Sequence, residues 1–282
     1  MPSDRLHVTQ RNGKLIYSPD VYDVVTSREP AIQIMVNSVV EKHNIIDDFD
    51  FVVRIADGPW DWDHFEPNHY AFCTKNNKFH EAFPDFHYIG QKEAGVSDYT
   101  TLVNSYIDSI PQTNKIGWIG AYTCGESTPR PKLGRMAVNS DYLEVIVNNI
   151  PGHLEDGYKY CQEYMTYQQQ VDRWKYLIDV EGCGWSGRFK LLLSSPRIVF
   201  FVDRPWQEWY FGYMEPWKHY VPVSRDLSDL HENYLRIEND TELQNHIKSN
   251  VKEFKEKYLT REKAEDRIYE IIQEVIARSK NS

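Results

Sequence analysis

The segment 176–202 contains the residue types of an anion-binding turn. It begins with an apolar run at residues 176–180 and a glycine-containing turn at 181–188. A second apolar run of helical length follows at 189–194, and a β-rich run at 197–202. Ser186, Gly187 and Arg188 stand where a strand would turn into a helix. Free backbone N–H groups at such a point attract anions, and arginine adds a fork of donors. The pattern predicts a phosphate-binding turn, with a serine N-cap and a solvated arginine as the simpler alternative.

A carboxylate placed for proton transfer follows an earlier strand-like run. Residues 51–55 are rich in β-branched side chains and stop at Ala56-Asp57-Gly58-Pro59. A carboxylate in a loop after a buried strand can accept a proton from a hydroxyl group, which is general-base chemistry. Spacing alone favours the simpler interpretation, in which Asp57 caps the turn before Gly58-Pro59.

The residues that follow offer a competing, metal-dependent chemistry. Asp61 and Asp63 flank Trp62, and carboxylates two residues apart can share a hard divalent cation. A polar loop around a tryptophan has the same pattern, so this motif is weak evidence for a metal. Trp60 and Trp62 have flat faces that could stack on a sugar ring, and core packing explains them equally well. The histidines of this region lack zinc-ligand spacing.

These residues need a scaffold of alternating strands and helices. Strands are predicted at residues 51–55, 71–74, 116–122, 142–147, 176–180 and 197–202, and helices at 31–43, 101–107, from about 132, 158–174, 189–194, 241–258 and 261–278. This alternation predicts an α/β fold with parallel sheets, which bind ligands beyond the carboxyl ends of their strands. The first segment is polar and has a turn at 11–13, and the chain has a break near residue 112. We therefore expect two domains, at residues 1–112 and 113–255. A C-terminal helix at 256–282 is expected to cross back to the first domain.

Composition excludes several classes of function. The chain has 282 residues and a net charge of −10, which argues against a nucleic-acid binder. Its first residues resemble no signal peptide, and no run approaches a membrane span, so we expect a cytoplasmic protein. Four cysteines lie far apart without a Cys-x-x-Cys pair, and we expect free thiols in a reducing compartment.

Two strings in the second half of the chain resemble glycosyltransferase family 90. One is Ser186-x-Arg188-Phe189-Lys190 with the apolar run after it, and the other is Pro216-Trp217-x-His219-Tyr220-x-Pro222-Val223, followed by Asp226-Leu227-Ser228. The family includes fungal capsule-associated proteins and Rumi-type protein O-glucosyltransferases. The resemblance is most specific over residues 174–230 and weaker over 51–59 and 116–133, about half of the chain in all. The chain's compact length suits a microbial or viral member, such as a xylosyltransferase.

The resemblance implies a GT-B fold, with two Rossmann-like domains and a nucleotide sugar held between them. It implies an inverting, metal-independent transfer of glucose or xylose from a UDP-sugar to a hydroxyl group of a glycan or protein, so the expected partner is a glycan or glycoprotein acceptor. Asp57 inherits the role of catalytic base, because residues 51–59 fit the family's V-x-x-x-D-x-P pattern. Arg188 inherits the contact with the UDP diphosphate.

Further site residues follow from this placement. Donor-binding residues are expected among Gly120, Tyr122, Thr123, Arg130, Ser186, Gly187, Arg188, Phe189 and Glu208, and acceptor-binding residues among Trp60, Trp62 and His64. Related enzymes carry an arginine shortly after the glycine matched by Gly120, and Arg130 or Arg135 would have to replace it here. Two other interpretations stay open: a manganese-dependent GT-A-type transferase that uses Asp61 and Asp63, and an inactive relative that binds a carbohydrate or nucleotide.

Overall fold

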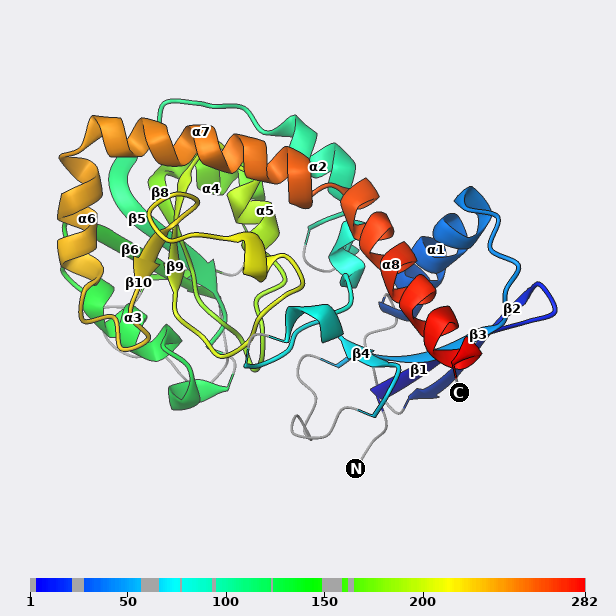
Figure 1. The fold of residues 1–282 in the computed structure, drawn as a ribbon. Coiled ribbons are helices and arrows are strands. Elements are labelled where there is room, and N and C mark those ends of the chain that lie inside the picture. The colour runs from blue at the N-terminus through cyan, green and yellow to red at the C-terminus, as the bar shows by residue number, and fades with distance from the viewer. Residues whose placement is uncertain are drawn as a thin grey trace. The chain divides into compact units, whose positions relative to one another are not determined.

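The computed structural model of the chain (Figure 1) describes residues 4–21, 28–56, 66–76, 78–92, 95–122, 124–148, 159–161 and 165–281. The chain divides into two compact units, each assembled from separate segments. Unit 1 comprises residues 1–102, 205–213 and 257–282, and unit 2 comprises residues 103–204 and 214–256. The chain thus passes from one unit to the other near residue 102, whereas the sequence suggested a boundary near 112, and the segment 205–213 belongs with the first unit.

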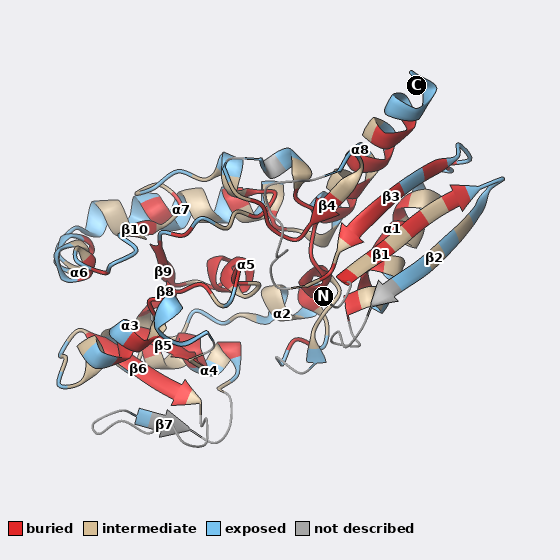
Figure 2. Cartoon of the chain, turned by 90° about the horizontal axis from the view of Figure 1, so that it is seen from below, coloured by how far each residue is buried: buried red, intermediate tan, exposed pale blue. Residues whose placement is uncertain are grey.

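Unit 2 is built on a six-stranded sheet in which every adjacent pair of strands is parallel. Its strand order is β10-β9-β8-β5-β6-β7. The strands are β5 (Thr113–Gly120), β6 (Leu143–Asn148), β7 (Lys159–Cys161), β8 (Trp174–Asp179), β9 (Ile198–Val202) and β10 (Val221–Val223). β-Branched and aromatic runs buried on both faces are typical of such strands, and every residue of β9 is buried (Figure 2). The predicted α/β class and parallel sheet are confirmed.

The helices of unit 2 connect and cover these strands. They are α3 (Arg130–Ala137), α4 (Tyr167–Arg173), α5 (Phe189–Leu193), α6 (Leu230–Glu238) and most of α7 (Thr241–Tyr258). Leu133 of α3, Leu230 and Ile237 of α6 and Ile247 of α7 pack into the same apolar core as the strands. The helix predicted at residues 158–174 is confirmed only over α4, because β7 occupies the beginning of this range. A capping box between Thr166 and Gln169 starts α4 at Tyr167.

Unit 1 contains a four-stranded mixed sheet in the order β2-β1-β3-β4. Its strands are β1 (Asp4–Arg11), β2 (Lys14–Val21), β3 (Phe49–Arg54) and β4 (His69–Ala71). Its helices are α1 (Arg28–Lys42) and α8 (Arg261–Lys280), which contact each other, and α2 (Tyr99–Ser105) begins in this unit. Short 3₁₀ turns lie at η1 (Phe79–Glu81), η2 (Phe86–Tyr88) and η5 (Phe211–Tyr213).

The first hairpin of unit 1 is a structure that the sequence analysis missed. β1 and β2 pair antiparallel around Asn12 and Gly13, which both have positive φ values, 52° and 72°. Such a two-residue turn matches the twist of the strands that it joins. Leu6 and Val8 point into the core and alternate with more exposed residues. The polar outer face hid this alternation, so only the turn was predicted.

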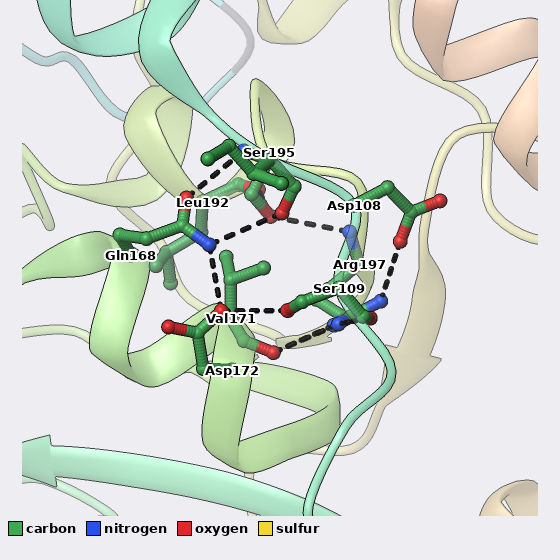
Figure 3. Close-up of polar contacts among 9 residues, drawn as sticks. Asp108, Ser109, Gln168, Val171, Asp172, Leu192, Ser195 and Arg197 are labelled. Atoms are coloured by element: carbon green, nitrogen blue, oxygen red, sulfur yellow. Dashed lines mark hydrogen bonds and ion pairs between the residues drawn. The ribbon is translucent and has the colours of Figure 1, made fainter.

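The amino-terminal end of β9 in unit 2 is held by a polar network (Figure 3). The guanidinium group of Arg197 donates hydrogen bonds to the carbonyl oxygens of Val171 at 2.9–3.0 Å and Ser109 at 2.5 Å, and it pairs with Asp108 at 2.9 Å. The hydroxyl group of Ser109 donates to Asp172 at 2.6 Å. This network holds the segment that leads into β5 at the amino-terminal edge of the sheet. Parallel sheets bind ligands at the opposite edge, beyond the carboxyl ends of their strands.

Candidate active site

The carboxyl ends of β5, β8 and β9 lie side by side in unit 2, and a buried carboxylate marks the middle strand. Asp179 ends β8 and is fully buried. It accepts a hydrogen bond from the Ser186 hydroxyl group at 2.7 Å, and the Nε atom of Arg188 lies 3.4 Å from it. Arg204, two residues after β9, forms a close ion pair with its other oxygen. Two of the predicted donor residues, Ser186 and Arg188, therefore converge on one acidic group.

The protonation of Asp179 follows from these contacts. Burial alone would raise the pKa of the Asp179 carboxyl group, but the guanidinium groups of Arg204 and Arg188 outweigh this effect and lower the pKa. Asp179 is therefore ionised at neutral pH. One carboxylate then faces two guanidinium groups, which leaves one positive charge in excess.

We call Asp179, Arg188 and Arg204 the arginine cluster. Arg204 has a side chain that is only 1% exposed, and that of Arg188 is 19% exposed. Nη1 of Arg188 donates to the carbonyl oxygen of Ile119 at 2.5 Å. Within the described residues, Nη2 of Arg188 and Nε and Nη1 of Arg204 are buried and have no hydrogen-bond partner. Buried N–H groups without partners cost free energy, so an anion that accepted from them would be favoured.

Neighbouring aromatic rings hold the two guanidinium groups in place. Arg188 lies over the ring of Trp118 at 5.3 Å, and Arg204 lies over Phe201 at 4.2 Å and Phe189 at 5.5 Å. Phe189 is fully buried, so it acts on the site by packing beneath Arg204. The helix that it begins, α5, spans five residues. The charge available to an anion here therefore comes mainly from arginine side chains, because so short a helix adds little.

The loops after β5 and β8 are joined covalently, which corrects the expectation of free thiols. Cys124 and Cys183 form a disulfide with a Cα–Cα distance of 5.4 Å, whereas Cys73 is a buried thiol. The two cysteines are 59 residues apart in sequence, but each follows one of two adjacent parallel strands. Loops that leave the same edge of a sheet can meet, and linear spacing does not show this.

Arg130 strengthens the same junction. Its guanidinium group donates to the carbonyl oxygens of Ala121 at 2.8 Å and Val180 at 3.3 Å. Arg130 thus lies at the edge that carries the arginine cluster. Arg135, the alternative second phosphate-binding residue, instead forms a bidentate pair with the exposed Glu126 at 2.7 and 2.9 Å.

The remaining predicted residues fall into three groups. Gly120 ends β5, and a Cβ atom there would lie 2.7 Å from the indole of Trp118; Tyr122 follows in the same loop. Glu208 lies in unit 1, where it is buried and accepts a hydrogen bond from the Tyr210 hydroxyl group at 2.8 Å. Asp57, Trp60, Asp61, Trp62, Asp63, His64 and Thr123 lie outside the described residues.

Two members of the arginine cluster were not singled out from the sequence. Asp179 ends an apolar run and looks like an ordinary strand boundary. Arg204 falls within the loop after β9 that the topology marked as part of the site, but nothing in the sequence pairs it with a residue 25 positions earlier. The sequence does contain one signal for both residues. Asp179 ends the buried strand β8 and Arg204 follows the buried strand β9, and charged residues at these positions indicate a site.

The described residues contain neither a metal-ligating cluster nor a membrane-spanning helix. Among them, no group of three or more histidine, cysteine, aspartate or glutamate side chains is arranged to hold a metal ion. Within the same part of the chain, none of the helices has the length and apolar character needed to cross a bilayer.

Comparison with known proteins identifies the same family that the strings suggested. The model of Glycosyl transferase family 90 matches residues 4–278. Protein O-glucosyltransferase 1 of Rattus norvegicus is 42% identical over 60 residues, which cover 21% of this chain and 15% of the rat protein. The O-glucosyltransferase rumi homolog of Aedes aegypti is 43% identical over 51 residues, 18% of this chain and 13% of that protein. The matched segment is thus a small part of these relatives.

Solved structures give a weaker likeness. The crystal structure of TarM aligns with a TM-score of 0.44 and 12% identity over 59% of this chain and 36% of that chain. The GtfA/B complex aligns with a TM-score of 0.40 and 10% identity over 60% of this chain and 38% of that chain.

Proposed function

Because the chain belongs to glycosyl transferase family 90, we propose that it transfers a sugar from a UDP-sugar to a hydroxyl group of a glycan or protein, with inversion at the anomeric carbon. Glucose and xylose are the proposed sugars. The matched rat and mosquito relatives are O-glucosyltransferases by name, which makes UDP-glucose the first donor to test.

The observation that carries this proposal is the arginine cluster. A nucleoside diphosphate carries several negative charges, and the cluster offers buried guanidinium N–H groups with one positive charge in excess. We assign the diphosphate contact to Arg188 and Arg204, with Ser186 and Gly187 shaping the turn. As the bond from the sugar to UDP breaks, negative charge grows on the leaving diphosphate. Fixed guanidinium groups therefore stabilise the transition state more than the bound donor.

The proton transfer is assigned to Asp57. In the proposed step, an acceptor hydroxyl oxygen forms a bond to the anomeric carbon while Asp57 takes the hydroxyl proton. The bond between the anomeric carbon and the phosphate oxygen breaks, and its electron pair leaves with UDP. One displacement of this kind inverts the anomeric centre. The proposal includes no metal ion, because the arginine side chains offset the charge of the diphosphate.

A UDP-release assay with purified chain, a panel of UDP-sugars and glycan acceptors tests the assignment. Asp57→Asn is expected to abolish turnover and to leave the thermal stabilisation by UDP nearly unchanged, because the base acts after the donor has bound. Arg188→Ala is expected to weaken UDP affinity by about 10- to 100-fold, through loss of charge-assisted hydrogen bonds. Arg135→Ala, at an exposed arginine paired with Glu126, is the matched control and should bind UDP normally.

The outcomes separate the alternatives. Full turnover by Asp57→Asn would refute the assignment of the base. Loss of activity in excess EDTA, restored by Mn²⁺, would favour a metal site at Asp61 and Asp63. A wild-type chain that UDP stabilises but that neither hydrolyses nor transfers any UDP-sugar would be a binding protein.

A further inference from the structure

Unit 1 contains a cavity that the proposed transfer reaction does not use. Its volume is about 570 Å³, within the usual range of about 300–1,000 Å³ for small-molecule sites. Three aromatic and three charged residues carry the argument: Trp209, Tyr213, Tyr258, Asp266, Arg267 and Glu270. All of them belong to unit 1, whereas the arginine cluster belongs to unit 2. We call this space the aromatic cavity.

Aromatic rings form part of the lining of the cavity. The rings of Tyr213 and Tyr258 stack with their centroids 4.4 Å apart and their planes 9° from parallel. Each ring therefore covers one face of the other. Tyr213 is nevertheless 54% exposed, so much of its surface is open to solvent. Trp209 is only 7% exposed and packs edge-on against Tyr210, which fixes the indole in the wall. A half-exposed ring mounted on a second ring is a rigid flat platform for a ligand.

Charged side chains of α8 form another part of the lining, and they are held in pairs. Lys263 pairs with Asp266 at 2.8 Å, and Arg267 pairs with Glu270 at 3.0 Å. Arg267 also donates to the carbonyl oxygen of His80 at 2.7 Å. The hydrogen bond from Lys263 lowers the pKa of Asp266, so this group stays a carboxylate at neutral pH. The cavity lining thus offers both carboxylates that accept hydrogen bonds and cations that donate them.

This combination selects for one chemical class of ligand. A phosphate or other anion favours cations that no carboxylate neutralises, but here Lys263 and Arg267 are each paired with a carboxylate of α8. Lys257, the remaining lysine of the lining, lies over the Tyr258 ring at 5.1 Å. A purely apolar ligand would leave the charged groups without water. A neutral sugar has C–H faces that pack flat on an aromatic ring and a rim of hydroxyl groups that both donate and accept. Its chemistry matches the platform and the paired charges together.

We propose that the aromatic cavity is a binding site for neutral sugar units of a glycan, with Tyr213 as the stacking platform. It is a ligand site in addition to the donor site and does not depend on which sugar is transferred. The carboxylates of Asp266 and Glu270 accept hydrogen bonds from sugar hydroxyl groups, and Arg267 donates to hydroxyl oxygens.

The test uses the full chain on an array of immobilised neutral glycans that includes glucose, xylose, mannose and galactose oligomers. The wild-type chain is expected to bind a subset of these glycans. Tyr213→Ala should weaken that binding by about tenfold or more, since loss of a buried aromatic contact is among the larger interface effects. Tyr213→Phe keeps the ring and should bind nearly as the wild type does. Leu235→Ala, which truncates a 45% exposed apolar residue in unit 2, is the control.

Two results would overturn the proposal: no binding of any neutral glycan by the wild-type chain, or equal binding by Tyr213→Ala. Tyr213→Ala could lose binding because it is less stable, which a lower melting temperature would reveal. In that case Glu270→Gln, a change at an exposed residue, tests the site instead. Thermal stabilisation by UDP, measured on the same proteins, separates this proposal from the transfer reaction. Glycan binding without thermal stabilisation by UDP would refute only the assignment of the donor site. Thermal stabilisation by UDP without glycan binding would refute only the proposal for the aromatic cavity.

Discussion

Replacement of Asp179 by asparagine tests whether the arginine cluster is organised as described. The change keeps the size of the side chain and removes its charge, so Arg188 and Arg204 lose their shared counterion. Arg204 is 1% exposed and Asp179 is fully buried, so water screens their interaction poorly. Removing one partner of a buried ion pair costs about 3–5 kcal/mol, a large part of the ~5–15 kcal/mol that stabilises an ordinary protein.

Urea unfolding measures this loss directly. With an unfolding slope of about 3 kcal/mol per molar, the midpoint of Asp179→Asn should fall by roughly 1–1.7 M. Glu126→Gln, which neutralises an exposed carboxylate paired with Arg135, is the matched control and should leave the midpoint unchanged. A midpoint for Asp179→Asn within about 0.3 M of the wild-type value, at an unchanged slope, would refute the buried pairing.

The pH dependence provides an independent check on the same residue. Folding lowers the pKa of Asp179, so its ionised form contributes stability above the ordinary aspartate pKa of about 3.9. That contribution is lost as the pH falls through the lowered folded-state pKa. The difference in stability between the wild type and Asp179→Asn should therefore be constant near neutral pH and shrink in acid. If the stability difference between the two proteins did not change with pH, the charge of the Asp179 carboxylate would not be the source of the lost stability.

Three further predictions concern the scaffold around the site. Reduction of the Cys124–Cys183 disulfide, which joins residues 59 apart, should lower the free energy of unfolding by about 4 kcal/mol, seen as a lower melting temperature with dithiothreitol and reproduced by Cys183→Ser. Gly117→Ala would place a Cβ atom 1.8 Å from the buried indole of Trp174, so a loss of about 1–3 kcal/mol is expected in urea unfolding. Burial alone would raise the pKa of Glu144, but hydrogen bonds from Arg173, Lys159 and Trp174 hold the pKa at about 2. Its contribution to stability should be complete above about pH 4.5 and lost between there and pH 2, a loss that Glu144→Gln should not show.

The strands of unit 2 could be predicted because each is a short apolar run between clear breaks. A parallel sheet then places the loops after β5, β8 and β9 at one edge, so the sequence alone assigns Ser186 and Arg188 to one site. The hairpin β1–β2 was missed, although its alternating residues and its Asn12-Gly13 turn are typical of a hairpin. Its inward residues, such as Leu6 and Val8, alternate with polar ones, and the sequence of the segment is polar on average.

The parts of the site that were missed depend on contacts between distant segments. Arg204 meets Asp179 because β8 and β9 are adjacent, and their relative register decides which side chains face each other. Register is set by packing of the whole sheet and is not written in either strand alone. The same holds for Cys124 and Cys183. Glu208 follows β9 closely in sequence, yet it belongs to unit 1, because the chain changes unit between Arg204 and Pro205.

The arginine cluster also explains why an anion site need not depend on a helix terminus here. The sequence placed Arg188 at a helix start, where a dipole would attract phosphate, but α5 has five residues and contributes little field. Asp179 instead holds Arg188 and Arg204 in position and offsets only one of their two charges. If Asp179 balanced both, a diphosphate would gain no charge complementarity; without Asp179, both guanidinium groups would repel each other. A single carboxylate therefore keeps two arginines close and leaves their remaining N–H groups for a ligand, at a cost in unliganded stability that donor binding would offset.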